Sequence, residues 1–198
     1  AEIVPVEVAD RKGDVTLVTC DEHPRAGVTL ESLRKLEPVF EVEGHQGIIT
    51  AGSASGIIDG GAALVLVSGS RAKLLGCRPL ARIAGWASAG VDPKIMGIEP
   101  VPAMQKLFGR LQQSVDDYDL VELNEAFAVQ VLAVLRDMPI ARDRLNVNGG
   151  AIALGHPIGC TGARIVVTLL HELERRDATR GLATLCVSGG MGMAMAFE

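Results

Sequence analysis

Hydrophobic and polar residues alternate along the N-terminal third of the chain in ways that predict short strands and one helix. Residues 3–8 alternate like a strand, and residues 14–20 fit its hairpin partner across an Arg-Lys-Gly-Asp turn. Thr29 can cap a short helix that Pro38 ends. Residues 62–67 are a continuous apolar run, which favours a strand buried on both faces of a layered structure.

The remainder of the chain continues this alternation of strands and helices. A short helix beginning at Ser68 or Ser70 should stop before Gly76. The later elements predicted are a strand from Leu80 to Ala89, a helix near residues 102–112, the strand DLVEL leading straight into the helix EAFAVQVLAVLRD, a helix over residues 163–176, and two final strands hinged at Gly189 and Gly190. Such an order predicts an α/β fold with a mostly buried sheet. A soft boundary falls at residues 76–79.

Composition narrows the class of protein. The chain has 48% hydrophobic residues, ample for a core, and a net charge of −5 without a long run of Lys or Arg. This balance argues against nucleic acid or a membrane as the main partner. There is no apolar run of membrane-spanning length and no basic-then-apolar leader. The 4 cysteines show no CxxC pairing, which predicts neither disulfides nor a metal site and favours a cytoplasmic location.

Candidate chemistry gathers in NVNGGAIALGHPIGCTGAR, residues 146–164, which joins a short strand to a long helix. Its five glycines allow tight turns and close approach to a ligand. Pro157 biases His156 toward an extended backbone, so the imidazole should sit on a stiff loop. Cys160, at the start of the helix and near His156, is a candidate nucleophile because a helix N-terminus and an imidazolium can lower a thiol pKa. The alternative is a glycine-rich turn with a histidine that serves the core.

Two further residues could carry chemistry. Asn124 lies where the strand DLVEL meets its helix, where it can be an ordinary N-cap or can aim its amide into a cleft. Cys186 lies in the penultimate strand, two residues before a glycine pair, where a cysteine can be inert core or a functional thiol.

VELNEAFAVQ, NVNGGAIALGHPIGCTGAR and GLATLCVSGGMGMAM, in this order, resemble the signature blocks of the thiolases, which are acyl-CoA acyltransferases. The resemblance extends through TAGSASG and RAGVTLESLRKLEP and so covers essentially the whole chain. It implies a thiolase-like α/β fold: residues 79–198 as a C-terminal βαβαββ-type domain, residues 57–78 as the last strand and helix of the N-terminal domain, and residues 1–56 as the rest of a loop domain with a segment that contacts coenzyme A.

The resemblance also implies catalytic roles. His156 matches the histidine that takes the proton of the nucleophile and helps to bind the thioester oxygen. Asn124 matches the asparagine that holds a water in that oxyanion site, where donors must face the negative charge of the enolate. Cys186 matches the acid/base that removes or returns a proton at the α-carbon of acetyl-CoA. Cys160 falls at a position that tolerates several small residues, so the resemblance makes it a helix-start residue.

Coenzyme A contacts follow from the same resemblance. Residues matching the pantetheine site are Ala54, Ser55, Ala126 and Phe127, and those matching the site of the adenine nucleotide are Arg25, Ser32 and Leu36. An ordinary amphipathic surface helix is the alternative for these last three. The sequence departs from the usual pattern at Ser53, at Ile58, and at Ser188, which replaces a glycine but keeps the backbone N–H of a second oxyanion hole.

The nucleophilic cysteine of the thiolases lies in a part of the family pattern that this sequence does not contain. We therefore expect the chain alone to be inactive, and to need an N-terminal thiolase half or partner subunit that supplies the thiol. The alternative is a non-catalytic module that binds acyl-CoA. The resemblance further implies coenzyme A thioesters as substrates, no cofactor, and a homo-oligomer.

Overall fold

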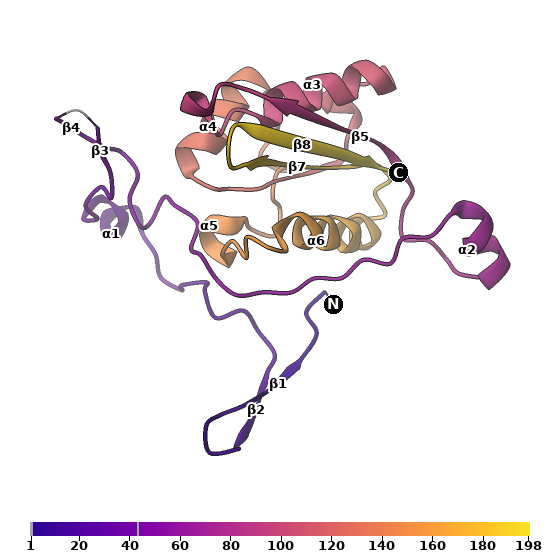
Figure 1. Cartoon of the computed structure of the whole chain (residues 1–198), viewed down its shortest axis with the longest axis horizontal. Coiled ribbons are helices and arrows are strands. Elements are labelled where there is room, and N and C mark those ends of the chain that lie inside the picture. Colours follow the sequence, from indigo (N-terminus) through magenta and orange to yellow (C-terminus); the bar gives the residue numbers. More distant parts are fainter. Residues whose placement is uncertain (1, 43) are drawn as a thin grey trace.

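The protein is described by a computed structural model that places residues 2–42 and 44–198, and its second half forms three layers (Figure 1). A sheet with the strand order β5-β8-β7-β6 is the middle layer, α3 and α4 cover one face, and α6 covers the other. The strands are β5 (Ile83–Gly90), β6 (Leu120–Leu123), β7 (Gly181–Val187) and β8 (Met191–Phe197), and the helices are α3 (Pro100–Leu111), α4 (Ala128–Asp137) and α6 (Thr161–Arg176). The predicted α/β class is confirmed.

Strand pairing in this sheet is mixed. β6 and β7 are parallel, and α6 belongs to the crossover that a parallel pair requires. β7 and β8 form an antiparallel hairpin whose turn holds Gly189 and Gly190 at φ values of 82° and 83°, where glycine is favoured. β5 pairs antiparallel with β8. As a result, the C-terminal ends of β6 and β7 lie side by side at one edge of the sheet.

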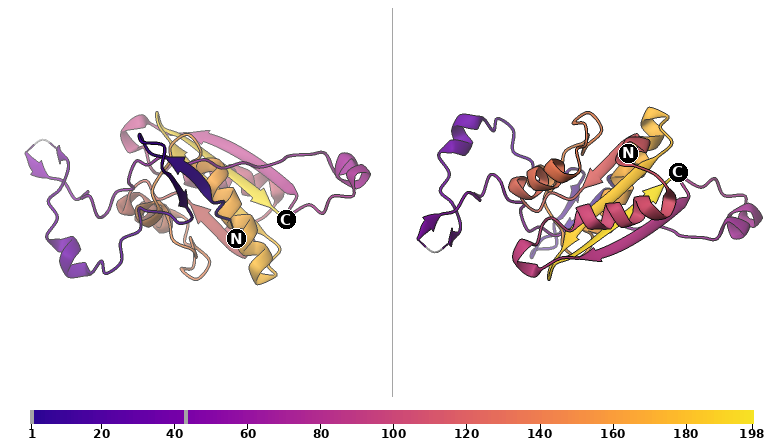
Figure 2. Two further views of the ribbon diagram at one scale, coloured as in Figure 1. Left: turned by 90° about the horizontal axis from the view of Figure 1, so that it is seen from below. Right: turned by 90° about the horizontal axis from the view of Figure 1, so that it is seen from above.

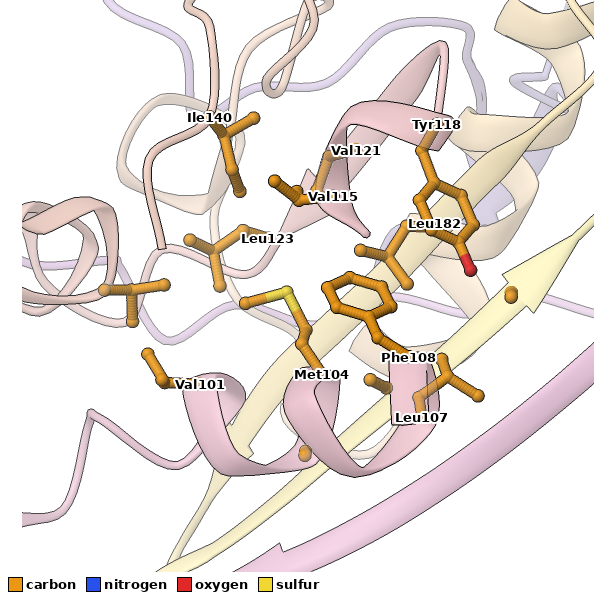
Figure 3. Close-up of a cluster of buried hydrophobic side chains, with 14 of the residues drawn as sticks. Val101, Met104, Leu107, Phe108, Val115, Tyr118, Val121, Leu123, Ile140 and Leu182 are labelled. Carbon is orange, nitrogen blue, oxygen red and sulfur yellow. The ribbon is translucent and has the colours of Figure 1, made fainter. Parts of the chain in front are cut away.

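Each helix layer packs on the sheet through an apolar stripe at helical spacing. On α6, Ile165, Leu169 and Leu173 contact a cluster that includes Ala183 and Phe197 of the sheet. On the opposite face, α3 contributes a second stripe that meets α4 and the strands β6, β7 and β8 (Figure 3). The side chains of this second cluster that Figure 3 labels are Val101, Met104, Leu107, Phe108, Val115, Tyr118, Val121, Leu123, Ile140 and Leu182.

The first third of the chain lies outside these layers, and Figures 1 and 2 show its hairpin on the side of α6 that faces away from the sheet. Its elements are β1 (Val6–Ala9), β2 (Val15–Val18), α1 (Leu30–Arg34), β3 (Glu41–Val42), β4 (His45–Gln46) and α2 (Gly69–Leu75). Thr29 caps α1 and Ser68 caps α2, as predicted. Three short helices complete the chain: η1 (Pro93–Ile95), η2 (Val115–Asp117) and α5 (Ala151–Leu154). Among the described helices, none has the length and apolarity to cross a membrane.

The strand predicted for residues 62–67 is wrong. The segment runs extended along α6 but pairs with no described strand, and it is not buried on both faces (Figure 1). Val65 and Leu66 are 93% and 70% exposed, whereas Leu64 packs partly against the α6 cluster. A strand is stabilised by ladder hydrogen bonds to a neighbour, and apolar sequence alone cannot supply that neighbour.

We predict that Leu169→Ala lowers the free energy of unfolding by about 2–5 kcal/mol, because Leu169 is 0% exposed and the substitution leaves a cavity between α6 and the sheet. Leu132→Ala on α4 is the matched control, since Leu132 is 56% exposed and should change stability by less than about 0.5 kcal/mol. Urea unfolding followed by circular dichroism measures both. Equal effects would contradict the packing of α6 described above.

Candidate functional site

An extended segment, residues 53–57, lies between the two loops that carry Asn124 and His156. On one side, two backbone hydrogen bonds join it to the residues after Asn124: Ser55 N–H to Ala126 O (3.0 Å) and Ala128 N–H to Ser53 O (2.8 Å). On the other side, the His156 N–H donates to the carbonyl of Gly56 (2.7 Å). The segment therefore brings the NEAF and GHP motifs together, although they are far apart in the sequence.

The imidazole of His156 is held by Thr161, the first residue of α6. Its Nδ1 lies 2.6 Å from Thr161 Oγ1, and that hydroxyl donates to the carbonyl of Pro157 (3.0 Å). Because a hydroxyl has one proton, Oγ1 accepts from Nδ1–H, which leaves the lone pair on Nε2. Burial, and secondly the charge of Arg164, lower the pKa of His156. At pH 7 the histidine is thus neutral and able to accept a proton.

Gly155 gives the GHP loop a backbone conformation that other residues rarely adopt. Its φ of 96° suits glycine, and a Cβ at this position would lie 2.5 Å from Cδ1 of Ile58. Ile58 therefore packs directly on the loop backbone beside His156. Ile58 stands where the thiolase pattern usually has a polar residue, and it gives the loop an apolar support.

Asn124 ends β6, and its backbone N–H donates to Thr184 O of β7 (3.0 Å). Its side chain is 1% exposed, and neither Oδ1 nor Nδ2 has a hydrogen-bond partner among the described residues. The interpretation as an N-cap is wrong, because α4 begins at Ala128 with Phe127 as its N-cap. A buried amide with both groups unpaired is costly unless it serves a ligand or water, so Asn124 is suited to binding.

Glu125 and Asn146 fix the backbone around Asn124. The Asn146 amide acts as a neighbouring strand would: it accepts from the Leu123 N–H (2.8 Å) and donates to the Leu123 carbonyl (2.9 Å). Glu125 accepts from Asn146 Nδ2 (3.3 Å) and from the Ile152 N–H at the start of α5 (3.2 Å). Sequence reasoning missed both residues, although Glu125 stands beside Asn124 in the NEAF motif and Asn146 opens the glycine-rich stretch.

Cys186 lies on β7, next to the strand end that carries Asn124. Its thiol is partly buried, and burial, followed by the negative charge of Glu99, raises the pKa of Cys186 to about 11. The resting group is therefore a protonated thiol. Ser188 follows in the exposed β7–β8 turn, beyond the last residue of β7. Ligands of α/β sheets bind at the carboxyl ends of parallel strands, and both Asn124 and Cys186 lie at such ends.

The residues assigned to coenzyme A fall into two groups. Ala54 and Phe127 form a backbone bridge, and Ser55 bonds to Ala126, so these four lie together beside the candidate site. Arg25, Ser32 and Leu36 belong to the region of α1. There, the Ser32 hydroxyl accepts from the Thr29 N–H (3.0 Å) in a capping box, and Leu36 lies against Gly52 in the turn before residue 53. Arg25 is exposed.

Cys160 is not joined to His156 by a hydrogen bond, since the imidazole Nδ1 contacts Thr161 instead. Cys160 is the residue before α6 and lines a cleft of about 840 Å³ together with Pro157 and Arg164. This cleft separates α6 from the N-terminal segments. Among the described residues, no group of three or more His, Cys, Asp or Glu side chains could hold a metal ion.

A buried contact between an arginine and a glutamate connects the two elements that hold the site. Arg164 Nη1 on α6 lies 3.8 Å from Glu122 Oε2 on β6, two residues before Asn124. Burial raises the pKa of Glu122 to about 8, with Arg164 opposing the shift. This shift weakens the negative charge that Glu122 sets against Arg164, whose guanidinium lowers the pKa of His156. Sequence reasoning missed this pair because its partners are distant along the chain.

Fold and site define a layered α/β protein with a histidine, an asparagine and a cysteine placed around one edge of a mixed sheet. Residues 77–198 match the family model described as thiolase, C-terminal domain, and residues 1–70 match thiolase, N-terminal domain. The chain belongs to the thiolase family.

Characterised relatives and solved structures agree with this assignment. The chain is 53% identical to an acetyl-CoA acetyltransferase of Allochromatium vinosum and 56% identical to a beta-ketoadipyl-CoA thiolase of Pseudomonas aeruginosa, covering 100% of this chain and 49% of each relative. It thus spans about half the length of the curated relatives it matches.

Two solved structures show the same fold. The acetyl-CoA acetyltransferase of Bacillus anthracis superposes with a TM-score of 0.94 at 51% identity, over 98% of this chain and 48% of that one. Human mitochondrial 3-ketoacyl-CoA thiolase in complex with CoA superposes with a TM-score of 0.83 at 43% identity, over 91% and 45% of the two chains. The predicted thiolase-like fold is confirmed.

We predict that Arg164→Met raises the pKa of His156 by about half a pH unit or more, because a nearby cation disfavours the imidazolium. NMR titration of the histidine C2–H signals measures this shift, with the His156 signal assigned by His156→Gln. Arg175→Met is the control: Arg175 is an exposed arginine of α6 that pairs with Glu172. A shift of equal size in both variants would show that Arg164 has no specific effect.

Proposed function

We propose that this chain is the C-terminal portion of an acyl-CoA C-acyltransferase that catalyses the reversible Claisen condensation and thiolysis of 3-ketoacyl-CoA. The observation that carries the proposal is Asn124: its buried amide has no partner among the described residues, at the end of the strand next to Cys186. Structural asparagines satisfy their amides locally, as Asn146 does. The names of the relatives support the reaction class.

Each residue has a step in this mechanism. The Nε2 of His156 takes the proton of a cysteine thiol supplied from outside this chain, and the thiolate attacks the C3 carbonyl of the 3-ketoacyl-CoA. The bond between C2 and C3 breaks, and Cys186 gives its proton to the enolate of acetyl-CoA. Asn124, through a water, and His156 stabilise the negative oxygen of the enolate. The acyl group then passes from the cysteine to the sulfur of coenzyme A, whose thiol proton returns to Cys186, and the proton held by His156 returns to the released cysteine; the reverse sequence is the condensation.

The backbone N–H of Ser188 would serve the second oxyanion hole, that of the acyl-enzyme. We propose the pantetheine site at the bridge between residues 54–55 and 126–127 and the adenine nucleotide site near α1, at Arg25, Ser32 and Leu36. The solved relative that contains CoA supports binding of this ligand class. The proposed substrates are coenzyme A thioesters, and the proposed acid–base steps use no cofactor or metal.

An apolar face supports the need for a partner half. Trp86 and Met193 are 60% and 41% exposed and lie on neighbouring strands on the α6 side of the sheet, where α6 covers β6 and β7 but leaves β5 open. Residues 62–67 add further exposed apolar surface on the other side of α6. Exposed apolar side chains on both sides of α6 are typical of an interface. We propose that the N-terminal thiolase half packs here, within a cytoplasmic homo-oligomer.

A non-catalytic module that binds acyl-CoA is the second candidate. Ser53 favours it in part, because its hydroxyl is engaged in the local turn, where it accepts from the Thr50 N–H (2.9 Å). Ser188 adds a side chain at the turn beside the site. Both candidates predict binding of coenzyme A, and only the enzyme predicts turnover.

We predict that the chain alone shows no thiolysis of acetoacetyl-CoA, and that co-expression with the N-terminal half of the Bacillus anthracis enzyme restores turnover. His156→Ala and Cys186→Ala should each lower kcat of the complex by about 10²–10⁴-fold, the usual contribution of an acid or base. His45→Ala and Cys77→Ala are matched controls in exposed positions and should leave kcat unchanged.

Three other outcomes would change the assignment. Turnover by the isolated chain would contradict the need for a partner half. Tight binding of coenzyme A by a stable complex without turnover would favour the non-catalytic module. Turnover that persists in Cys186→Ala would remove the acid/base role from this residue.

A further inference from the structure

Glu99, the residue before α3, is buried on the face of the sheet that α3 covers. Its side chain is 0% exposed. The Gly97 N–H donates to Oε2, whereas Oε1 has no hydrogen-bond partner among the described residues. A carboxylate withdrawn from water with one oxygen unpaired is costly, so its position is unusual for a group that only packs.

Gly192 brings Glu99 close to Cys186. It is the antiparallel partner of Cys186, and by strand alternation both face α3, as Leu182 and Ala194 do. A Cβ on Gly192 would lie 2.5 Å from the carbonyl oxygen of Glu99. Glycine at this position lets the start of α3 lie directly against the sheet, one strand away from the thiol.

None of the ion pairs among the described residues includes Glu99. The polar neighbour across Gly97 is Gln130 of α4, since a Cβ on Gly97 would lie 3.1 Å from Gln130 Cγ. Gln130 is 5% exposed, and its amide is also unpaired within the described structure. No ion pair among the described residues therefore offsets the effect of the Glu99 carboxyl on Cys186.

We propose that Glu99 is a positioning residue for Cys186, whose carboxylate lies close enough to the thiol to disfavour its ionisation and to make the thiolate, once formed, a stronger base. The role of Glu99 in catalysis rests on the proposed acid/base function of Cys186. Its effect on the ionisation of the Cys186 thiol does not. In that mechanism, Glu99 makes the Cys186 thiol a weaker acid toward the enolate and its thiolate a stronger base toward the α-proton.

Other titratable groups lie around the same strand end. Asp92 and Lys94 belong to the η1 region beside the β7–β8 turn, where Gly190 lies against Pro93, and His156 lies in the loop before α6. Of these groups, Glu99 is the one whose charge contributes to raising the pKa of Cys186, second to burial.

The test is the pH dependence of Cys186 alkylation by iodoacetamide in the full chain, between pH 7.5 and pH 10.5, followed by peptide mass spectrometry. Thiolate is the reactive form, so a pKa lowered by one unit raises the rate at pH 9 by up to about tenfold. We expect Glu99→Gln to give a several-fold increase at Cys186 and none at the exposed Cys77. Glu174→Gln removes an exposed carboxylate and is the control for net charge.

The shape of the profile separates charge from exposure. A substitution that merely exposes Cys186 multiplies its alkylation rate equally at every pH. Loss of the charge instead lowers the pH at which the alkylation rate reaches its plateau. Glu99→Asp keeps the charge and should follow the native profile. Glu99→Ala is a second neutral variant in case Glu99→Gln does not fold. Native profiles in both neutral variants, or a pH-independent increase, would overturn the proposal. Because alkylation needs no turnover, this result is independent of whether the partner half restores activity.

Discussion

Backbone hydrogen bonding of residues 53–57 is the constraint on which the site depends. The segment bonds on one side to the link after Asn124 and on the other to the loop of His156. Both loops lack regular structure, so without the segment their polar backbone groups would need other partners. Pairing through main-chain atoms also tolerates changes of side chain, which explains how Ser53 and Ile58 can depart from the family pattern while the path of the chain is kept.

Elements stabilised by local chemistry could be predicted from the sequence, and those that depend on distant partners could not. Thr29 and Ser68 cap their helices with their own side chains, and the final hairpin needs only its glycine pair, so these predictions are confirmed. Residues 62–67 carry the pattern of a strand but lack a partner. The short helix α5 went unpredicted because one of its N-terminal N–H groups, that of Ile152, donates to Glu125, a residue from another motif. The roles of the site residues stay predictions.

On the α6 side of the sheet, the part formed by β5 and β8 lacks a covering helix among the described residues. α6 covers β6 and β7, and β5 and β8 are left with Trp86 and Met193 exposed on that side. Across the sheet, α3 packs on both β5 and β8, so the opposite face is closed. A sheet that is buried on one face and half-covered by apolar side chains on the other is less favourable in water than in an assembly. The span of the chain, about half of its relatives, agrees with this asymmetry.

The environments of His156 and Cys186 push their pKa values in opposite directions, which separates a base from an acid within one site. For the histidine, burial and a cation disfavour the charged form, so it remains able to accept a proton. For the cysteine, burial and an anion disfavour the charged form, so it retains a proton. The N-terminus of α3 lies on the same face of the sheet and by itself would favour a thiolate. A carboxylate at that helix start opposes the effect of the helix, and under the role proposed for Glu99 it makes the Cys186 thiolate, once formed, a stronger base.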